Sequence, residues 1–290
     1  MSDLTSQIPR TAPVVVAVDN SDTAMTAAQF AASEAEQRRL PLLITHCFMW
    51  PTFYPPLTQP YPPDPQPRER AEAMLAAVAA EIRGKHPELD ISTRMLNGSP
   101  AAMLVDMSRS AAMLVLGHRG SGGFAGLHIG SVAIHTAAHS RCPVLVVRGA
   151  LGGPQAPILV GVDGSVESDL ARRFAFETAK LRGAILRVVA VWPPAWTSPP
   201  RQEEYPAHRP AEMILLDQLG DMTAQYPDLT IDTRVVHSNT AAGALLAESA
   251  DAGLVVVGSR GRGGLRGILL GSVGRALIAH APCPVAVVRN

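Results

Sequence analysis

Lysine, cysteine and aromatic residues are scarce in this chain of 290 residues, and the chain has no net charge. Only Lys85 and Lys180 are lysines, so arginine supplies nearly all of the positive charge. The 25 acidic residues balance the 25 basic ones. The chain therefore lacks the basic excess that is typical of general nucleic-acid binders and of membrane-surface proteins. We expect neither a nucleic-acid partner nor a membrane partner.

Cysteine use and the lack of long apolar runs indicate the compartment. The three cysteines, Cys47, Cys142 and Cys283, are odd in number and far apart, which is typical of free thiols in a reducing compartment. No run approaches the ~18 consecutive apolar residues that a membrane-spanning helix needs. The first residues show no cationic stretch followed by an apolar core, so we expect no secretory leader. These features predict a cytoplasmic protein.

Three segments of the chain occur twice, between 141 and 144 residues apart. The repeated pairs are Val14-Val-Val-Ala-Val-Asp19 with Ile158-Leu-Val-Gly-Val-Asp163, Met113-Leu-Val-Leu-Gly117 with Leu254-Val-Val-Val-Gly258, and Cys142-Pro-Val with Cys283-Pro-Val. Two copies at so long a period indicate a duplicated domain rather than a solenoid. A Gly/Pro-rich stretch at 149–157 is suited to a linker. We predict domains at 12–149 and 156–290.

Short apolar runs alternate with longer amphipathic stretches in each copy, which predicts an α/β fold. The runs are apolar at successive positions, as expected of parallel strands that are covered on both faces. Each domain should be a doubly wound, five-stranded parallel sheet of order 3-2-1-4-5, flanked by helices such as Arg70–Lys85. The predicted strands are Val14–Val18, Leu42–Phe48, Ile91–Met95, Met113–Leu116, Val144–Val147, Ile158–Val162, Ile185–Val191, Ile231–Val236, Leu254–Val257 and Val285–Val288.

Proline is concentrated in Pro51–Pro67 and Pro193–Pro210, each after the second strand of its copy. Such segments neither propagate helix nor complete a strand ladder, so they should be exposed excursions. They are either lids or docking loops, or ordinary insertions. Trp50 and Trp192, at the ends of the same strands, are better suited to the edge of the core than to base stacking.

A glycine-rich loop follows the fourth strand of each copy. The loops share the spacing Gly-x2-Gly-x9-Gly-Ser, from Gly117 to Ser131 and from Gly258 to Ser272. Clustered glycines let backbone N–H groups approach an anion, and the serines would be N-caps of the next helices, whose N-termini favour phosphate. In a doubly wound sheet the ligand lies where the strand order reverses, between the first and fourth strands. Asp19 and Asp163 follow the first strands and should face these loops.

Each loop lies in a third of its domain that has no acidic residue. None occurs between Asp106 and Ala150, and none follows Asp251. Arg119 and Arg260, at matching places in the loops, are candidates for phosphate contact. For Arg141, Arg148 and Arg289 we expect solvated positions.

At these residues the chain resembles the universal stress protein family in its tandem, ATP-binding form. The resemblance covers nearly the whole chain and implies one ATP site in each domain. Asp19 and Asp163 would contact the adenosine, and the backbone of Cys47 and Val189 would meet the adenine. Phosphates and ribose would lie near the loops and the first strands, at Ala17, Gly117, Arg119, Gly120, Ser121, Gly122, Gly123, Gly130, Ser131, Val132, Gly161, Gly258, Arg260, Gly261, Arg262, Gly263, Gly264, Gly271, Ser272 and Val273.

The two copies differ at one site position: Ala17 stands where the second copy has Gly161, and its methyl group would crowd the base or ribose. The second loop also holds more arginine. We therefore expect the second site to bind more tightly. The closing strands are apolar edges, which should pack the two domains together, and a homodimer is expected beyond that.

Several enzyme signatures are missing. The chain has no P-loop motif, and neither lysine lies near a glycine loop. No carboxylate follows either loop to hold a metal or to activate water, and His139-x-x-Cys142 and His280-x-x-Cys283 offer two ligands each, too few for structural zinc. We expect no catalytic residues and no metal site, and the ATP that the resemblance implies would be bound either alone or with Mg²⁺. A stress-response regulator that binds nucleotide is favoured, with an unknown protein partner. A slow ATPase or phosphotransferase, or a scaffold with vestigial sites, stays open.

Overall fold

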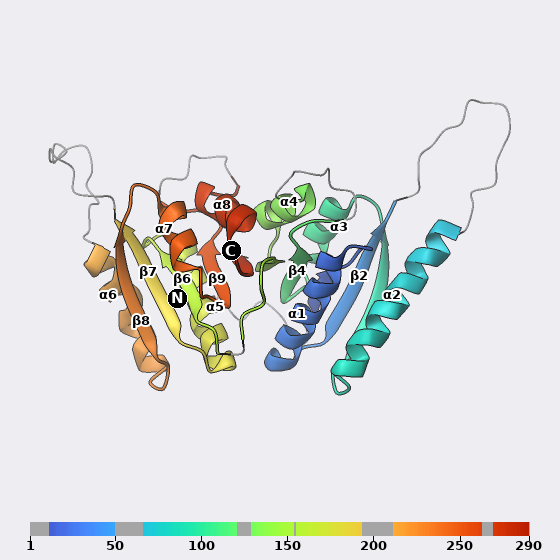
Figure 1. The fold of residues 1–290 in the computed structure, drawn as a ribbon, viewed down its shortest axis with the longest axis horizontal. Helices are drawn as coiled ribbons and strands as arrows, with labels where there is room; N and C mark the ends of the chain where they lie inside the picture. Colours follow the sequence, from blue (N-terminus) through green and yellow to red (C-terminus); the bar gives the residue numbers. More distant parts are fainter. Residues whose placement is uncertain are drawn as a thin grey trace, which may run out of the picture.

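The computed structural model describes residues 12–49, 66–120, 129–153, 155–192, 211–262 and 269–289. In this part of the chain ten strands form one sheet, and helices cover both of its faces (Figure 1). The strands are β1 Val14–Ala17, β2 Leu42–Phe48, β3 Ile91–Asn97, β4 Met113–Gly117, β5 Val144–Val147, β6 Ile158–Val162, β7 Leu186–Trp192, β8 Ile231–His237, β9 Leu254–Gly258 and β10 Val285–Val288. The helices are α1 Asp22–Arg38, α2 Gln66–Lys85, α3 Pro100–Met107, α4 Ser131–His139, α5 Val166–Arg182, α6 Ala211–Gln225, α7 Ala241–Glu248 and α8 Ser272–His280.

The strand order is β3-β2-β1-β4-β5-β10-β9-β6-β7-β8. Each half has the predicted order 3-2-1-4-5, with parallel neighbours throughout. The halves meet at β5 and β10, which pair antiparallel with Val146 opposite Val285. The expectation that the closing strands would join the two domains is therefore confirmed, and the join makes one continuous sheet.

The core has two layers, one on each face of this sheet. Alternate residues of a strand point to opposite faces: Val14 and Val16 of β1 pack beneath α1 and α2, and Val15 packs with Leu104 of α3 on the other face. The second half repeats this arrangement with α5 and α6 on the first face and α7 and α8 on the second. Burial on both faces explains why the strands are apolar at successive positions.

Serine caps start the helices that follow the first strand of each copy. Ser21 Oγ accepts from the N–H of Ala24 at the start of α1, and Ser165 Oγ accepts from the N–H of Ser168 at the start of α5. A side-chain oxygen that accepts from the first helical turn fixes where the helix begins. The capped starts hold α1 and α5 close to the carboxyl ends of the strands.

All ten predicted strands are present; four have the predicted ends, and the ends of the other six are shifted by one or two residues. Trp192 packs against the core, as predicted, whereas Trp50, Pro193–Pro210 and all but the last two residues of Pro51–Pro67 lie outside the described residues. Among the helices that the structure describes, none combines the length and the apolar character that crossing a membrane requires.

Candidate functional site

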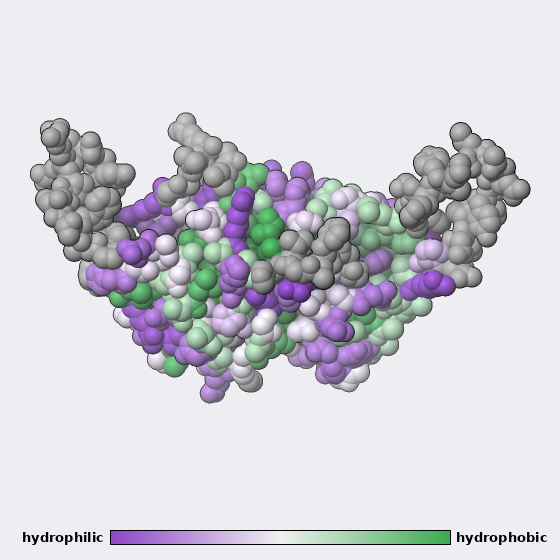
Figure 2. Space-filling model, turned by 45° about the horizontal axis from the view of Figure 1, so that its top comes forward, coloured by the Kyte–Doolittle hydropathy of each residue, from purple (hydrophilic) through white to green (hydrophobic). Residues whose placement is uncertain are grey.

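The candidate sites lie at the carboxyl ends of β1 and β4 in the first domain and of β6 and β9 in the second. β1 and β4 are neighbours, with Val16 opposite Val115, and β6 and β9 repeat this register with Val160 opposite Val256. The chain therefore leaves adjacent strands in opposite directions at both places, as predicted. Figure 2 shows hydrophilic and hydrophobic residues interspersed on the side of the molecule that it presents.

In the first domain Asp19 lies against the loop that follows β4. Asp19 Oδ1 accepts from the N–H of Ser21 at 3.0 Å and from Ser21 Oγ at 2.5 Å. A Cβ atom placed on Gly120 would lie 2.6 Å from Asp19 Oδ2. Thr23 Oγ1 donates to the carbonyl of Arg119 at 2.6 Å, which ties the loop to α1. The structure thus brings the predicted aspartate and the second loop glycine together.

The second domain repeats this arrangement at Asp163. Its Oδ1 accepts from the N–H of Ser165 at 2.9 Å and from Ser165 Oγ at 2.6 Å, and its Oδ2 accepts from the N–H of Arg262 at 2.9 Å. A Cβ atom on Gly261 would lie 2.4 Å from Asp163 Oδ2. One backbone N–H group of the loop, that of Arg262, therefore already points toward a carboxylate oxygen, an arrangement that also suits an anion.

The first loop glycines are required by close packing. A Cβ atom on Gly258 would lie 2.7 Å from the carbonyl oxygen of Glu167, and one on Gly117 would lie 2.9 Å from Thr23 Oγ1. Real side chains do not come so near to backbone, so these positions hold glycine because the helix start approaches the strand end. They let the helix start lie against the strand end whether or not they touch a ligand.

The helices that follow the loops begin one residue earlier than predicted. Gly130 and Gly271, rather than Ser131 and Ser272, are the N-caps, and the two serines are the first helical residues. The N–H of Gly130 donates to the carbonyl of His118, and that of Gly271 donates to the carbonyl of Ser259, both at 2.8 Å. Neither helix has a side-chain cap, in contrast to α1 and α5. The first N–H groups of α4 and α8 are therefore left for another acceptor.

The two residues predicted to meet the adenine are not structural counterparts. Thr45 pairs with Ala17, and Val189 pairs with Gly161, so Val189 corresponds to Thr45 rather than to Cys47. Val189 is fully buried, whereas Cys47 and its true counterpart Val191 are half-buried. Burial raises the pKa of the Cys47 thiol to about 11, so this thiol stays protonated at neutral pH.

The difference between Ala17 and Gly161 has a packing reason. A Cβ atom on Gly161 would lie 2.8 Å from Leu245 Cδ1, on α7. The counterpart Ala17 is half-buried against the core layer that contains Leu104. The residue type at this position therefore follows how closely the covering helix approaches β1 or β6.

Glu167 is a site residue that the sequence analysis missed. Arg260 Nη2 donates to Glu167 Oε1 at 2.6 Å, across the mouth of the second site. Glu167 lies in the first turn of α5, 91 residues before its loop begins, so a search for carboxylates after the glycine loop passes over it. The signal that identifies it is its place four residues after Asp163. In the first domain the same place holds Thr23.

Arg148 and Arg289 are not solvated, contrary to the sequence expectation. Both are half-buried, and each reaches the other domain. Arg148 Nη1 donates to the carbonyls of Leu277 and Ile278, at the end of α8, and Arg289 donates to the carbonyl of Ala138, at the end of α4. Sequence offers no sign of this, because the partner carbonyls belong to the other copy. Arg141 is exposed, as expected.

His118 lies in the first loop near Arg148 and Arg119. Burial lowers the pKa of its ring, and the nearby guanidinium groups of Arg148 and Arg119 lower it further, which outweighs the contact of Nδ1 with the carbonyl of Val147. The ring is therefore neutral at neutral pH. The second domain has the buried Ser259 at this position, so the two sites share no imidazole.

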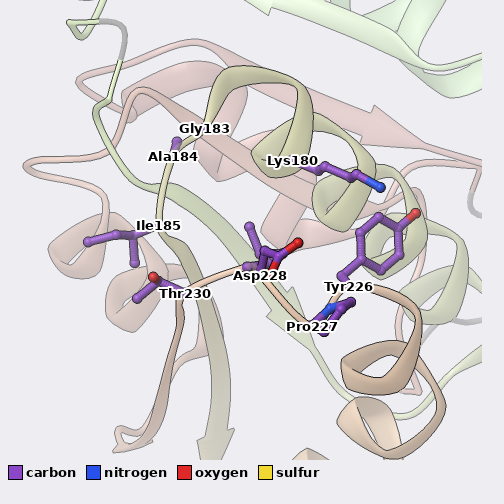
Figure 3. Close-up of a pocket in the computed structure, with 9 residues that line it drawn as sticks. Lys180, Gly183, Ala184, Ile185, Tyr226, Pro227, Asp228 and Thr230 are labelled. Atoms are coloured by element: carbon purple, nitrogen blue, oxygen red, sulfur yellow. The ribbon is translucent and has the colours of Figure 1, made fainter.

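Ser121, Gly122, Gly123, Gly263 and Gly264 lie outside the described residues. In the described part of the chain, no group of three or more His, Cys, Asp or Glu side chains is placed to hold a metal ion. A cavity of about 200 Å³ lies away from the candidate sites, at the amino ends of β7 and β8, between the end of α5 and the loop before β8 (Figure 3). Lys180 and Tyr226 line it, and the first domain has the His86–Glu36 pair in the corresponding place.

The fold and these two candidate sites define a tandem pair of doubly wound α/β domains, each with a glycine loop facing an aspartate. The model of the universal stress protein family matches residues 11–148 and 156–289, so the chain belongs to the universal stress protein family. The chain is 36% identical to the universal stress protein Rv2623 of Mycobacterium tuberculosis over 289 residues, which cover 96% of each protein. It is 33% identical to a universal stress protein of Mycolicibacterium smegmatis, with 95% of this chain and 96% of that protein covered.

A solved structure supports the fold over the whole chain. A universal stress protein from Archaeoglobus fulgidus matches with a TM-score of 0.72, and the match covers 97% of both chains. The two sequences are only 18% identical, so this likeness concerns the fold.

Proposed function

We propose that the chain binds adenine nucleotide, with one ATP in each domain, and acts as a nucleotide-dependent regulator of the stress response in the cytoplasm. One observation carries the proposal: each glycine loop leads into a helix without a side-chain cap and lies against an aspartate from the neighbouring strand, and this is built twice. Uncapped N–H groups at a helix start suit phosphate oxygens.

The residues present fit the parts of a nucleotide. The N–H groups of Ser131 and Val132, with those of Ser272 and Val273 in the second domain, would hold phosphate oxygens. The N–H and the hydroxyl of Ser21 hold Asp19 in place, and those of Ser165 hold Asp163. Both carboxylates would accept from ribose hydroxyls. Cys47 and Val191 would line the adenine. Because the described residues offer no metal cluster of their own, Mg²⁺ would come with the phosphates.

Binding is tested by titrating nucleotide-free protein with ATP in a calorimeter. We expect wild type to bind and the double variant Asp19→Ala/Asp163→Ala to lose at least tenfold in affinity, since each removed carboxylate contact is worth about 1.5 kcal/mol or more. Equal affinity of the two proteins would contradict the proposal.

The alternative of a slow ATPase or phosphotransferase uses the same pockets. Glu167 is the observation that keeps it open for the second domain, because it brings a carboxylate to that loop. Phosphate release by wild type, Gly120→Ala and Gly261→Ala distinguishes the two functions. Turnover that depends on Gly261 would support an enzyme, and binding without release would support a regulator.

The homodimer is also part of the proposal. Since β5 and β10 cover each other, a second copy would have to use another surface, such as the outer strands β3 and β8. Light scattering with ATP present tests it, and a monomer would exclude it.

A further inference from the structure

The two candidate sites differ in charge at one pair of corresponding residues. Glu167 and Thr23 both lie four residues after the site aspartate, and both press against the first loop glycine: a Cβ atom on Gly258 would meet Glu167 backbone and Cβ within 3 Å, and one on Gly117 would meet Thr23 Oγ1 at 2.9 Å. The two side chains therefore occupy equivalent places at the mouths of the two sites. One is a carboxylate and the other is a neutral hydroxyl.

The two side chains engage the loop arginines differently. Glu167 Oε1 accepts from the guanidinium of Arg260 at 2.6 Å, with 21% of the Glu167 side chain and 46% of the Arg260 side chain exposed. Thr23 instead donates to the backbone carbonyl of Arg119 at 2.6 Å, and Arg119 is exposed. Among the described residues, no acidic side chain pairs with Arg119.

A phosphate that enters the second site thus meets an arginine whose charge a carboxylate already balances. To contact Arg260, the phosphate must displace Glu167 or share the guanidinium with it, and like-charge repulsion from Glu167 grows with the number of phosphate charges. In the first site the corresponding arginine is positive and the neighbouring threonine is neutral. Sites built on the same plan should therefore rank the same nucleotides differently.

We propose that Glu167 is a specificity-determining residue, which makes the second site select an adenine nucleotide of low net charge, while the first site accepts the full triphosphate. Low charge can come from fewer phosphates, as in AMP, or from a divalent cation bound to ATP. The proposal rests on the proposed nucleotide-binding function. Ala17 and the arginine count predict that the second site binds more tightly, whereas this proposal predicts that the first site binds metal-free ATP more tightly.

The test measures each site alone. Gly130→Ala is used to weaken the first site and leave the second, in which Glu167→Thr installs the first-site residue and Glu167→Gln removes the charge at nearly constant size. Each protein is titrated with adenosine, with AMP and with ATP, the last in EDTA and in Mg²⁺. We expect both Glu167 variants to raise the affinity for metal-free ATP by about tenfold relative to the affinity for AMP, which is the contribution of one charge-assisted contact. Adenosine affinity should stay the same.

The reciprocal variant is Thr23→Glu in a Gly271→Ala background. We expect it to weaken metal-free ATP by about the same factor, and Mg²⁺ should restore much of the loss. Mg²⁺ should likewise narrow the gap between ATP and AMP in the unmodified second site. If the difference between the affinities for ATP and AMP were the same in EDTA and in Mg²⁺, the selection would depend on the number of phosphates and not on net charge.

Two failures are distinguishable. If the Gly130→Ala protein binds adenosine and AMP but the ratio of ATP to AMP affinity is unchanged by Glu167→Thr and Glu167→Gln, the specificity role is wrong and nucleotide binding stands. Glu167 would then serve only the first turn of α5, where an acidic residue stabilises a helix, and its loss would lower stability without changing the ratio. If neither domain binds adenosine or any nucleotide, the proposed function fails and this inference fails with it.

Discussion

Charged residues are buried where α1 contacts α5, at the place where the two domains meet on one face of the sheet. Glu34 is 2% exposed, and its carboxylate accepts from Arg38 Nε at 3.1 Å and from Arg182 of the other domain. Arg38 in turn donates to Thr178 Oγ1 at 2.7 Å. The guanidinium of Arg38 lies over Phe174, a residue of the other domain. Two positive charges thus share one buried carboxylate.

The environment of Glu34 shifts its pKa. Burial raises the pKa of the carboxyl, but the charges and hydrogen bonds of Arg182 and Arg38 together outweigh burial and hold it below the ordinary value of 4.5. A folded-state pKa below the unfolded one means that the carboxylate stabilises the fold fully above the ordinary pKa. This stabilisation is lost as the pH falls through the lowered folded-state value.

Replacement of Glu34 by Gln should lower the free energy of unfolding by about 3 kcal/mol at neutral pH, because it removes the buried carboxylate that both guanidinium groups share and leaves Arg38 only the exposed Glu177. Urea denaturation at a series of pH values measures this loss. The difference between wild type and Glu34→Gln should narrow below about pH 4.5, where the wild-type carboxyl begins to lose its advantage. Glu72→Gln, which breaks an exposed pair with Arg68, is the matched control and should change little. A difference that stays constant into acid would contradict this assignment.

The helices beside the glycine loops show which loop glycines are needed for packing and which are left for binding a ligand. Gly117 and Gly258 are fixed by the approach of α1 and α5, so alanine there forces a helix to move. Gly130 and Gly271 have ordinary surroundings, because a Cβ atom would lie 3.5 Å from the nearest atom in both, and their φ values of −77° and −65° suit any residue. Nothing in the described fold requires glycine at the starts of α4 and α8. We attribute these two glycines to the room that a phosphate needs.

Gly130→Ala and Gly271→Ala should therefore fold normally and bind nucleotide poorly. We expect the free energy of unfolding to change by about 1 kcal/mol or less, the usual range for a change at an N-cap. The affinity of the altered domain for ATP should fall about tenfold, through loss of close N–H contacts. Denaturation and calorimetry on the same samples measure both. If Gly130→Ala were as destabilising as Gly117→Ala, the glycine would be structural.

The whole molecule is held together by two crossed arginines as well as by β5 and β10. Arg148 and Arg289 leave the ends of these strands and donate to the last carbonyls of the other domain's α8 and α4, the helices whose first turns face the candidate sites. A cation at a helix C-terminus is favourable, because the last carbonyls carry partial negative charge. The two domains are thus fastened through the helices that begin at the glycine loops (Figure 1).

Arg148→Met should lower the free energy of unfolding by about 1 to 2 kcal/mol, since it removes a cation from the end of α8. Arg141→Met is the matched control, because Arg141 is an exposed arginine of the same domain and should tolerate the change within about 0.5 kcal/mol. Thermal denaturation compares the two. Equal stability of the variants would show that the crossed contact contributes nothing.

What sequence predicts here is what lies within one copy. The repeat, the apolar runs and the glycine spacing predict the strands, the order 3-2-1-4-5 and the meeting of Asp19 with Gly120, because each depends on local pattern and on the rules for parallel sheets. The one-residue error at Ser131 arises because glycine and serine are both acceptable N-caps, and only the backbone angles choose between them.

The remaining features depend on contacts between segments that are far apart in sequence. The Glu34 cluster and the crossing of Arg148 and Arg289 join one copy to the other, and a pattern inside one copy holds no trace of them. Glu167 was missed because its role comes from the approach of α5 to a loop that begins 91 residues later. The charged residues near a site therefore have to be identified from the three-dimensional structure and not from their distance along the sequence.

The central claim is that each domain holds one adenine nucleotide. The most direct test denatures protein saturated with ATP and washed free of excess, and measures by chromatography the amount of adenine nucleotide released per chain. The account predicts two nucleotides per chain from wild type. It predicts one from Gly130→Ala or Gly271→Ala, at a concentration that leaves the altered domain empty, and none from the Gly130→Ala/Gly271→Ala double variant. Release of no nucleotide from wild type, or equal release from wild type and the double variant, would contradict it.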